Sequence, residues 1–283
     1  MSNIILTADS TCDLTPELKN KYQVSYIPLH IVLGEKSYED GVNITPPEIY
    51  QNFEATGTLP KTAAVSTGEY LEVFRPVVER GDSVIHINLG SAISSSYQNA
   101  CIAAEELGNV YVVDSCNLST GSGHIVIEAA KMIEQGMDAP EIAEKLRALT
   151  KKVHSSFVID KLDYLRAGGR CSTLAVLGAN LLRIKPSIFV SNADGSMTVG
   201  KKYRGKLENV LIQYVDEQLS AYNNIRTDKI FITHAGIGES YVKLVYDHLK
   251  SKDYFENIYI TTASCTISSH CGPGTLGILF MTE

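Results

Sequence analysis

The sequence predicts an α/β protein of two domains, an N-terminal, largely parallel sheet flanked by helices and a C-terminal mixed α/β domain. Short apolar strands alternate with helix-length segments through the first half of the chain, which is the pattern of βαβ units. A hairpin interrupts this alternation in the second half. The 283 residues suffice for two cores. We place the boundary near residue 160, giving domains 1–160 and 161–283.

In the first half, strand segments are bounded by turn residues and helices begin at capping residues. Thr15 followed by Pro16 is typical of a helix start, and "TPPE" and "STGE" are capping boxes in which a hydroxyl precedes a glutamate by three residues. We expect extended segments at 3–9, 24–33, 36–40, 83–89, 109–114 and 154–159. We expect helices after Thr15, from 45–48 and 66–69, over 95–107 and 119–136, and after Asp138.

In the second half, the near-continuous apolar run from Leu174 to Leu182 predicts a buried helix. Asp194-Gly195 predicts the turn of a hairpin. The remaining expected elements are a helix at 204–222, a strand at 228–234, a helix at 239–251, and strands at 257–262 and 276–282.

Composition excludes several classes of protein. The formal net charge of -7 disfavours nucleic-acid binding, because phosphate contacts require a surplus of Lys and Arg on one face. The sequence contains no run of 18 apolar residues, so it predicts no membrane-spanning helix. The six cysteines form no C-x-x-C pair, and the N-terminus lacks the basic region of a signal peptide. We therefore expect a reduced, cytoplasmic protein.

Hydroxyl side chains follow three of the predicted parallel strands, at the sheet edge where such folds bind ligands. For any single serine, a role as a turn former or cap is the commoner explanation. The repetition at three strand ends is what indicates a binding site. These residues are Ser10, Thr11, Ser91, Ser94, Ser115 and Ser119.

Three motif matches fail on their context. "GPGTLG" at 272–277 matches a dinucleotide-binding fingerprint, but a β-like segment follows it where a helix is required. "GSMTVGKK" at 195–202 resembles a P-loop, but Lys202 stands where a Mg²⁺-binding hydroxyl is required. Cys265, His270 and Cys271 lack a fourth zinc ligand. We expect no nucleotide site, no metal and no cofactor.

The remaining polar residues fit an anion. Thr62, Ser94 and Ser95 precede predicted helix starts, whose free N–H groups and dipoles favour negative charge. Arg170 supplies fixed donors for an oxyanion, and His270, next to "GPG", can carry or give a proton near neutral pH. The spacing in sequence leaves open whether these five residues meet.

Seven segments in this order resemble the DegV family, which includes the fatty-acid-binding subunits of bacterial fatty acid kinases. The resemblance runs the whole length of the chain. The segments are "DSTCDL" at 9–14, "PKTAAVS" at 60–66, "SAISSSYQ" at 91–98, "VDS" with "STGSG" at 113–123, "LRAGGR" at 165–170, "LLRIKP" at 181–186 and "SSHCGPGTLG" at 268–277.

The resemblance implies a two-domain carrier without catalytic residues that buries one long-chain fatty acid. Thr62 and Ser94, with Ser95 and His270 beside them, would bind the carboxylate, and Arg170 and His270 would assist its transfer. The tail would lie in the C-terminal domain. A separate dihydroxyacetone-kinase-like subunit would use ATP to make an acyl phosphate for phospholipid synthesis, and transient membrane contact is compatible with this role. The expected tail pocket comprises Leu174, Leu177, Leu181 and Ile188.

Two blocks depart from the family pattern. Ala63-Ala64-Val65 stands where the family commonly has Ser-Gln-Pro, and Ser95 replaces a usual glycine. Two alternatives therefore stay open. One is a hydrolase or acyltransferase that uses Ser94 or Ser95 with His270. The other is a regulatory binder of a different small carboxylic acid.

Overall fold

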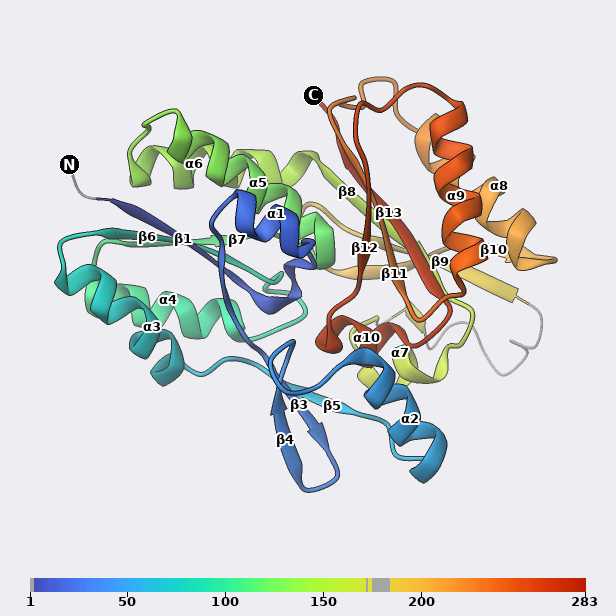
Figure 1. The fold of residues 1–283 in the computed structure, drawn as a ribbon, viewed down its shortest axis with the longest axis horizontal. Coiled ribbons are helices and arrows are strands. Elements are labelled where there is room, and N and C mark those ends of the chain that lie inside the picture. The colour runs from blue at the N-terminus through green and yellow to red at the C-terminus, as the bar shows by residue number, and fades with distance from the viewer. Residues whose placement is uncertain (1–2, 172, 175–183) are drawn as a thin grey trace.

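The computed structural model describes residues 3–171, 173–174 and 184–283 and has the predicted α/β architecture (Figure 1). Three sheets organise the chain: a four-stranded sheet, a six-stranded sheet and a small three-stranded sheet. Within the described residues, no helix is long and apolar enough to cross a membrane.

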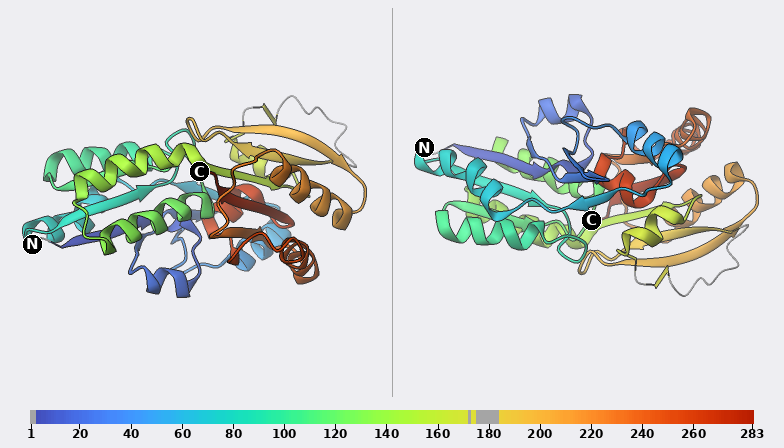
Figure 2. Two further views of the ribbon diagram at one scale, coloured as in Figure 1. Left: turned by 90° about the horizontal axis from the view of Figure 1, so that it is seen from above. Right: turned by 90° about the horizontal axis from the view of Figure 1, so that it is seen from below.

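The four-stranded sheet is entirely parallel, with strand order β2-β1-β6-β7. Its strands are β1 (Ile4–Asp9), β2 (Ser25–Ile27), β6 (Ser83–Asn88) and β7 (Val110–Asp114). Figures 1 and 2 show helices on both of its faces. These are α3 (Thr67–Glu79) and α4 (Ser96–Leu107) on one side, and α5 (Ser119–Glu134) and α6 (Ala139–Leu149) on the other.

The predicted helix starts are confirmed in atomic detail. The Thr15 side chain accepts a hydrogen bond at the start of α1 (Pro16–Lys21), and Asp138 does so at the start of α6. Both capping boxes form, with Ser66 and Glu69 at α3 and with Thr45 and Glu48 at α2 (Pro46–Thr56). Each cap satisfies N–H groups that a helix end leaves without partners.

The six-stranded sheet is mixed, with strand order β10-β9-β8-β13-β11-β12. The predicted hairpin joins β9 and β10, which are antiparallel. Helices α8 (Leu207–Ser220) and α9 (Glu239–Ser251) pack against this sheet. Its strands are β8 (Val153–Val158), β9 (Ile184–Val190), β10 (Met197–Arg204), β11 (Ile230–Ala235), β12 (Ile258–Thr262) and β13 (Thr275–Met281).

Strand β8 lies before the predicted domain boundary at residue 160 but pairs with β9 and β13 of the six-stranded sheet. The division into domains 1–160 and 161–283 stays a prediction. The two larger sheets are joined through α5, because Glu128 on α5 forms ion pairs with Arg226 and Lys229 next to β11. Phe231 of β11 and Leu279 of β13 also pack in the apolar cluster beneath α5.

The small sheet has strand order β4-β3-β5, and all its pairs are antiparallel. Its strands are β3 (His30–Leu33), β4 (Lys36–Glu39) and β5 (Lys61–Ala63). Figure 1 shows this sheet projecting beneath the junction of the two larger sheets, next to α2 and α10 (Cys265–Cys271). Helix α10 also contacts α7 (Asp163–Gly168) and the 3-10 turn η1 (Ser10–Cys12).

Helix α10 is not among the helices that the sequence predicts. The chain is helical through Cys271, and the turn begins at Gly272, where φ is +71°. Such a φ favours glycine. The helix predicted over 174–182 lies, except for Leu174, outside the described residues.

Candidate functional site: a head-group pocket between the sheets

A pocket of about 240 Å³ opens where the four-stranded, six-stranded and small sheets meet. All five residues predicted to handle an anion lie on its wall, although they come from segments up to 208 positions apart. Apolar side chains complete the lining. The lining residues are Leu29, Thr62, Ala63, Ala64, Leu89, Ile93, Ser94, Ser95, Leu118, Leu165, Arg170, Met197, Thr266, Ile267, His270 and Cys271.

Thr62 and His270 form the polar centre of the pocket. Thr62 lies in the middle of β5, and His270 lies in the last turn of α10. The Thr62 Oγ1 atom is 2.8 Å from His270 Nε2, within hydrogen-bond distance. This bond joins the small sheet to a helix from the far end of the chain.

His270 is held as a neutral imidazole. Burial, with the Arg170 charge as a second cause, lowers its pKa to about 4. Its ring packs against Gly168 so closely that a Cβ atom at position 168 would lie 2.3 Å from His270 Nδ1. A neutral imidazole at this place offers a hydrogen bond to a ligand without an added charge.

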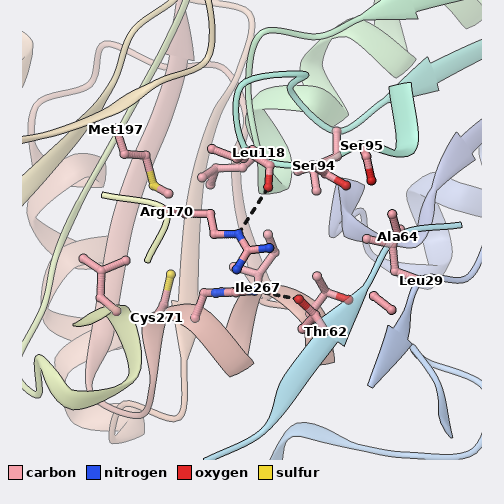
Figure 3. Close-up of a pocket in the computed structure, with 16 residues that line it drawn as sticks. Leu29, Thr62, Ala64, Ser94, Ser95, Leu118, Arg170, Met197, Ile267 and Cys271 are labelled. Atoms are coloured by element: carbon pink, nitrogen blue, oxygen red, sulfur yellow. Dashed lines mark hydrogen bonds between the residues drawn. The ribbon is translucent and has the colours of Figure 1, made fainter. Parts of the chain in front are cut away.

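Ser94 and Ser95 lie at the N-terminal end of α4, where Ser95 occupies the N-cap position. The Ser94 Oγ atom accepts the Ser96 N–H at 3.2 Å and lies 3.0 Å from the Ser96 hydroxyl. In Figure 3 both serines lie across the pocket from the backbone of Arg170. Their hydroxyls and the start of α4 favour an anion.

Arg170 bridges the two sides of the pocket mouth. Its Nη1 atom donates to the Gly168 carbonyl at 2.6 Å, and its Nε atom donates to the Ile93 carbonyl at 3.5 Å. Figure 3 shows its side chain reaching across the pocket toward the side that carries Ser94. The side chain is exposed, so its charge is available both to a ligand and to a partner at the surface.

Three of the other strand-end hydroxyls form hydrogen bonds within the fold, whereas the buried Thr11 hydroxyl has no hydrogen-bond partner among the described residues. Ser10 donates to Asp40 at 3.0 Å, Ser119 donates to Asp13 at 2.5 Å, and Ser115 lies 2.8 Å from the Ser122 hydroxyl. None of these serines lines the head-group pocket, although Ser119 lines the second cavity described below. The common explanation, that strand-end serines stabilise turns, holds for them.

Cys271, which sequence reasoning left without a role, lines the pocket. Burial raises the pKa of its thiol to about 12, so the group is protonated at neutral pH. Among the residues that the structure describes, no group of three or more His, Cys, Asp or Glu side chains is arranged to hold a metal ion.

The apolar wall belongs to a buried cluster whose residues come from both sides of position 160. Leu89, Leu118, Leu165, Met197, Ile267 and Cys271 belong to both the pocket lining and this cluster. Of the predicted tail residues, Leu174 and Ile188 are buried in the same cluster without lining the pocket. Leu177 and Leu181 lie outside the described residues. No sequence pattern singles out Leu29 or Met197 as pocket residues.

A second, smaller cavity of about 30 Å³ adjoins the first. The two share Leu118, Ile267 and Cys271 in their walls. The second cavity reaches the six-stranded sheet at Phe157 and Gly277. The site therefore has hydroxyl, imidazole and guanidinium groups near the mouth and an apolar interior. An amphipathic anion has this distribution of polarity.

Fold and site together define an α/β protein of three sheets with a pocket at their junction that combines polar groups with a partly apolar wall. The model of the DegV family matches residues 3–283, and the chain belongs to this family. A DegV domain-containing protein of Clostridium perfringens is 30% identical over 289 residues, covering 100% of both chains.

Solved structures agree in fold over the whole chain. A DegV family protein of Thermus thermophilus, described with fatty acid binding, has a TM-score of 0.91 at 26% identity and covers 99% of this chain and 100% of its own. DegV of Bacillus subtilis, a fatty acid binding protein, has a TM-score of 0.85 at 26% identity, covering 100% of both. A stearic acid-binding protein of Eubacterium ventriosum has a TM-score of 0.81 at 27% identity, covering 100% and 98%.

Proposed function

We propose that this protein is a cytoplasmic carrier that buries one long-chain fatty acid with its carboxylate at Thr62, Ser94, Ser95 and His270. The convergence of these residues on one pocket carries the proposal. The fatty acids described with the Thermus, Bacillus and Eubacterium relatives support the ligand class. The predicted domains, 1–160 and 161–283, then meet at the head group, and the tail extends into the second.

The apolar part of the site suits the tail. The wall formed by Leu118, Ile267 and Cys271 leads away from the polar mouth into the second cavity. Leu174 and Ile188 are buried in the surrounding cluster, and we assign the tail pocket to them together with Leu177 and Leu181. Each buried methylene contributes about 0.8 kcal/mol of transfer free energy, so a long tail dominates the affinity.

We further propose that the protein presents the carboxylate of the bound fatty acid to a separate dihydroxyacetone-kinase-like subunit. A carboxylate oxygen attacks the γ-phosphorus of ATP, the bond from that phosphorus to the bridging oxygen breaks, and ADP leaves. The product is an acyl phosphate, a precursor suited to phospholipid synthesis. Arg170, exposed at the mouth, offsets the charge that accumulates as the two anions meet.

The contacts of His270 favour a carrier over a Ser/His hydrolase. Its Nε2 atom is hydrogen-bonded to Thr62, and among the described residues it has no hydrogen bond with Ser94 or Ser95. A pKa of about 4 makes it a weak base, and no carboxylate bonds its Nδ1 atom in the part of the chain described. These properties suit a site that must not hydrolyse its acyl phosphate.

Replacing Thr62 by Val tests the carboxylate site. Valine keeps the β-branched shape that suits β5 but removes a charge-assisted hydrogen bond of about 1.5–3 kcal/mol, so palmitate affinity should fall about 10- to 100-fold. Calorimetric titration with palmitate measures this. Thr150→Val is the matched control, because it also removes a partly buried threonine hydroxyl bond, to the Arg147 carbonyl at 3.0 Å, but Thr150 lines neither of the two cavities. Equal palmitate affinities in wild type and Thr62→Val would remove Thr62 from the site.

Replacing His270 by Ala tests the transfer role. With a dihydroxyacetone-kinase-like subunit, ATP and loaded carrier, acyl phosphate formation should fall on the order of 100-fold, because the head group loses a preorganised polar contact. Hydroxylamine trapping of the acyl phosphate measures the rate. His154→Ala, another partly buried histidine with a lowered pKa, lies outside the pocket and should transfer at the wild-type rate. An unchanged rate in His270→Ala would refute the transfer role of this residue.

A further inference from the structure

Two buried carboxylates bond the N-terminal end of helix α10, and one of them, Asp40, bonds the backbone of its first two residues. The Cys265 N–H donates to Asp40 Oδ1 at 2.7 Å, and the Thr266 N–H donates to Asp40 Oδ2 at 3.2 Å. The Ser10 hydroxyl also donates to Asp40 Oδ2, at 3.0 Å. Asp40 is only 3% exposed, so these are charge-assisted bonds shielded from water.

The anchors at the two ends of α10 belong to the same small sheet. Asp40 directly follows β4, and Thr62, which bonds His270 at the other end, lies in β5. His30 of β3 is paired with Glu39 on one side and with Ala63 on the other. Asp40 is therefore next to Glu39 and Thr62 is next to Ala63, the two residues that pair with His30. The sheet holds α10 at both ends.

A third contact at the helix start comes from elsewhere in the fold. Asp13 accepts the Ser264 N–H at 2.9 Å, but it follows η1 next to the four-stranded sheet. Among the described residues, Asp40 supplies the side-chain hydrogen bonds that tie the start of α10 to the small sheet, where Cys265 also packs in one apolar cluster with Ile31 of β3. Because α10 has only seven residues, a displacement of its first turn is transmitted directly to His270.

We propose that Asp40 is a positioning residue for the head-group pocket: it fixes α10 on the small sheet so that His270 meets Thr62. The part of this proposal that concerns lipid rests on the proposed function. Asp40 lines a separate cleft together with Ser264 and Cys265 and does not line the head-group pocket, so its effect on a ligand is exerted through the helix.

Replacing Asp40 by Asn tests the proposal with little change of shape. The amide keeps one acceptor but turns its N–H₂ group toward the Thr266 N–H or the Cys265 N–H, so one anchoring bond is lost. As α10 loosens, water reaches the His270 ring and its pKa should rise from about 4 toward the ordinary value of 6.5. Loss of a negative charge alone would lower the pKa of a nearby histidine. A rise therefore reports movement of the helix.

Histidine NMR titration of the lipid-free protein measures this pKa, and calorimetry measures palmitate affinity, which should fall about tenfold. Asp228→Asn is the control, because it removes a carboxylate that bonds Arg226 and Lys229 far from α10. It should destabilise the fold yet leave the titration of His270 and the affinity unchanged. A folded Asp40→Asn variant in which His270 titrates as in wild type overturns the proposal.

If Asp40→Asn does not fold, Ser10→Ala decides the matter. The Ser10 hydroxyl donates to Asp40 and accepts the Leu29 N–H at 3.2 Å, so its removal loosens the same anchor less severely. We expect a smaller rise in the pKa of His270, and no rise contradicts the proposal. The NMR readout needs no ligand. A wild-type protein that ignores palmitate would refute the proposed function while the titration still tests Asp40.

Discussion

Replacing Gly168 by Ala is expected to displace His270 from the head-group pocket and so to weaken the binding of the fatty acid. A Cβ atom at this position would lie 2.3 Å from His270 Nδ1, well inside contact distance, so the ring must leave Thr62. Overpacking of this kind costs about 1–3 kcal/mol of stability. Loss of the polar centre should lower palmitate affinity about 10- to 100-fold, which calorimetric titration measures.

The neighbouring glycine provides the matched control. Gly169 has φ +65°, and a Cβ atom there would meet nothing within 4 Å. Gly169→Ala should therefore cost about 1–2 kcal/mol of backbone strain and leave His270 in place. Both variants should lower the stability of the fold, but only Gly168→Ala should displace His270, so comparing their palmitate affinities separates the two effects. If both bind palmitate as the wild type does, contact with Gly168 does not set the position of His270.

Replacing Lys229 by Met is expected to destabilise the junction of the two larger sheets by about 3 kcal/mol. Lys229 is 5% exposed, and its Nζ atom lies 2.9 Å from Glu128 Oε1 and 2.8 Å from Asp228 Oδ2. Removing the cation leaves Glu128, on α5, with its charge only partly compensated by Arg226 and Lys131. The urea midpoint of unfolding should fall accordingly.

Lys243→Met is the control for this prediction. Lys243 pairs with Asp247 one turn along α9, and its side chain is 74% exposed, so the change in stability should stay within about 0.5 kcal/mol. Equal midpoints for Lys229→Met and the wild type would show that the buried pair does not hold the junction.

The sequence predicts most elements of the fold because their local signals agree with the tertiary structure. Thr15, Ser66 and Asp138 cap the helices that they were expected to cap, and the Asp194-Gly195 turn joins a hairpin. Helix α10 escaped prediction because Cys, Thr, Ser and His are weak helix formers and seven residues give no clear period. Asp40 and Asp13, distant in sequence, provide the bonds that stabilise it.

The sequence predicts which residues form the candidate site but not how they contact one another. Thr62, Ser94, Ser95, Arg170 and His270 were chosen from the residues and the family resemblance, and the structure brings them to one pocket. The contact between Thr62 and His270 spans 208 positions, which no local pattern reveals. Strand β5 has three residues, too few for a periodic signal. Its pairing with β3 depends on the tertiary structure.

The most direct test of the central claim is mass spectrometry of the purified protein, in the native state and after organic extraction. The account predicts one long-chain fatty acid per chain, released on denaturation, and a lower occupancy in Thr62→Val. A wild-type protein that is empty, and that stays empty after incubation with palmitate and stearate, would contradict it.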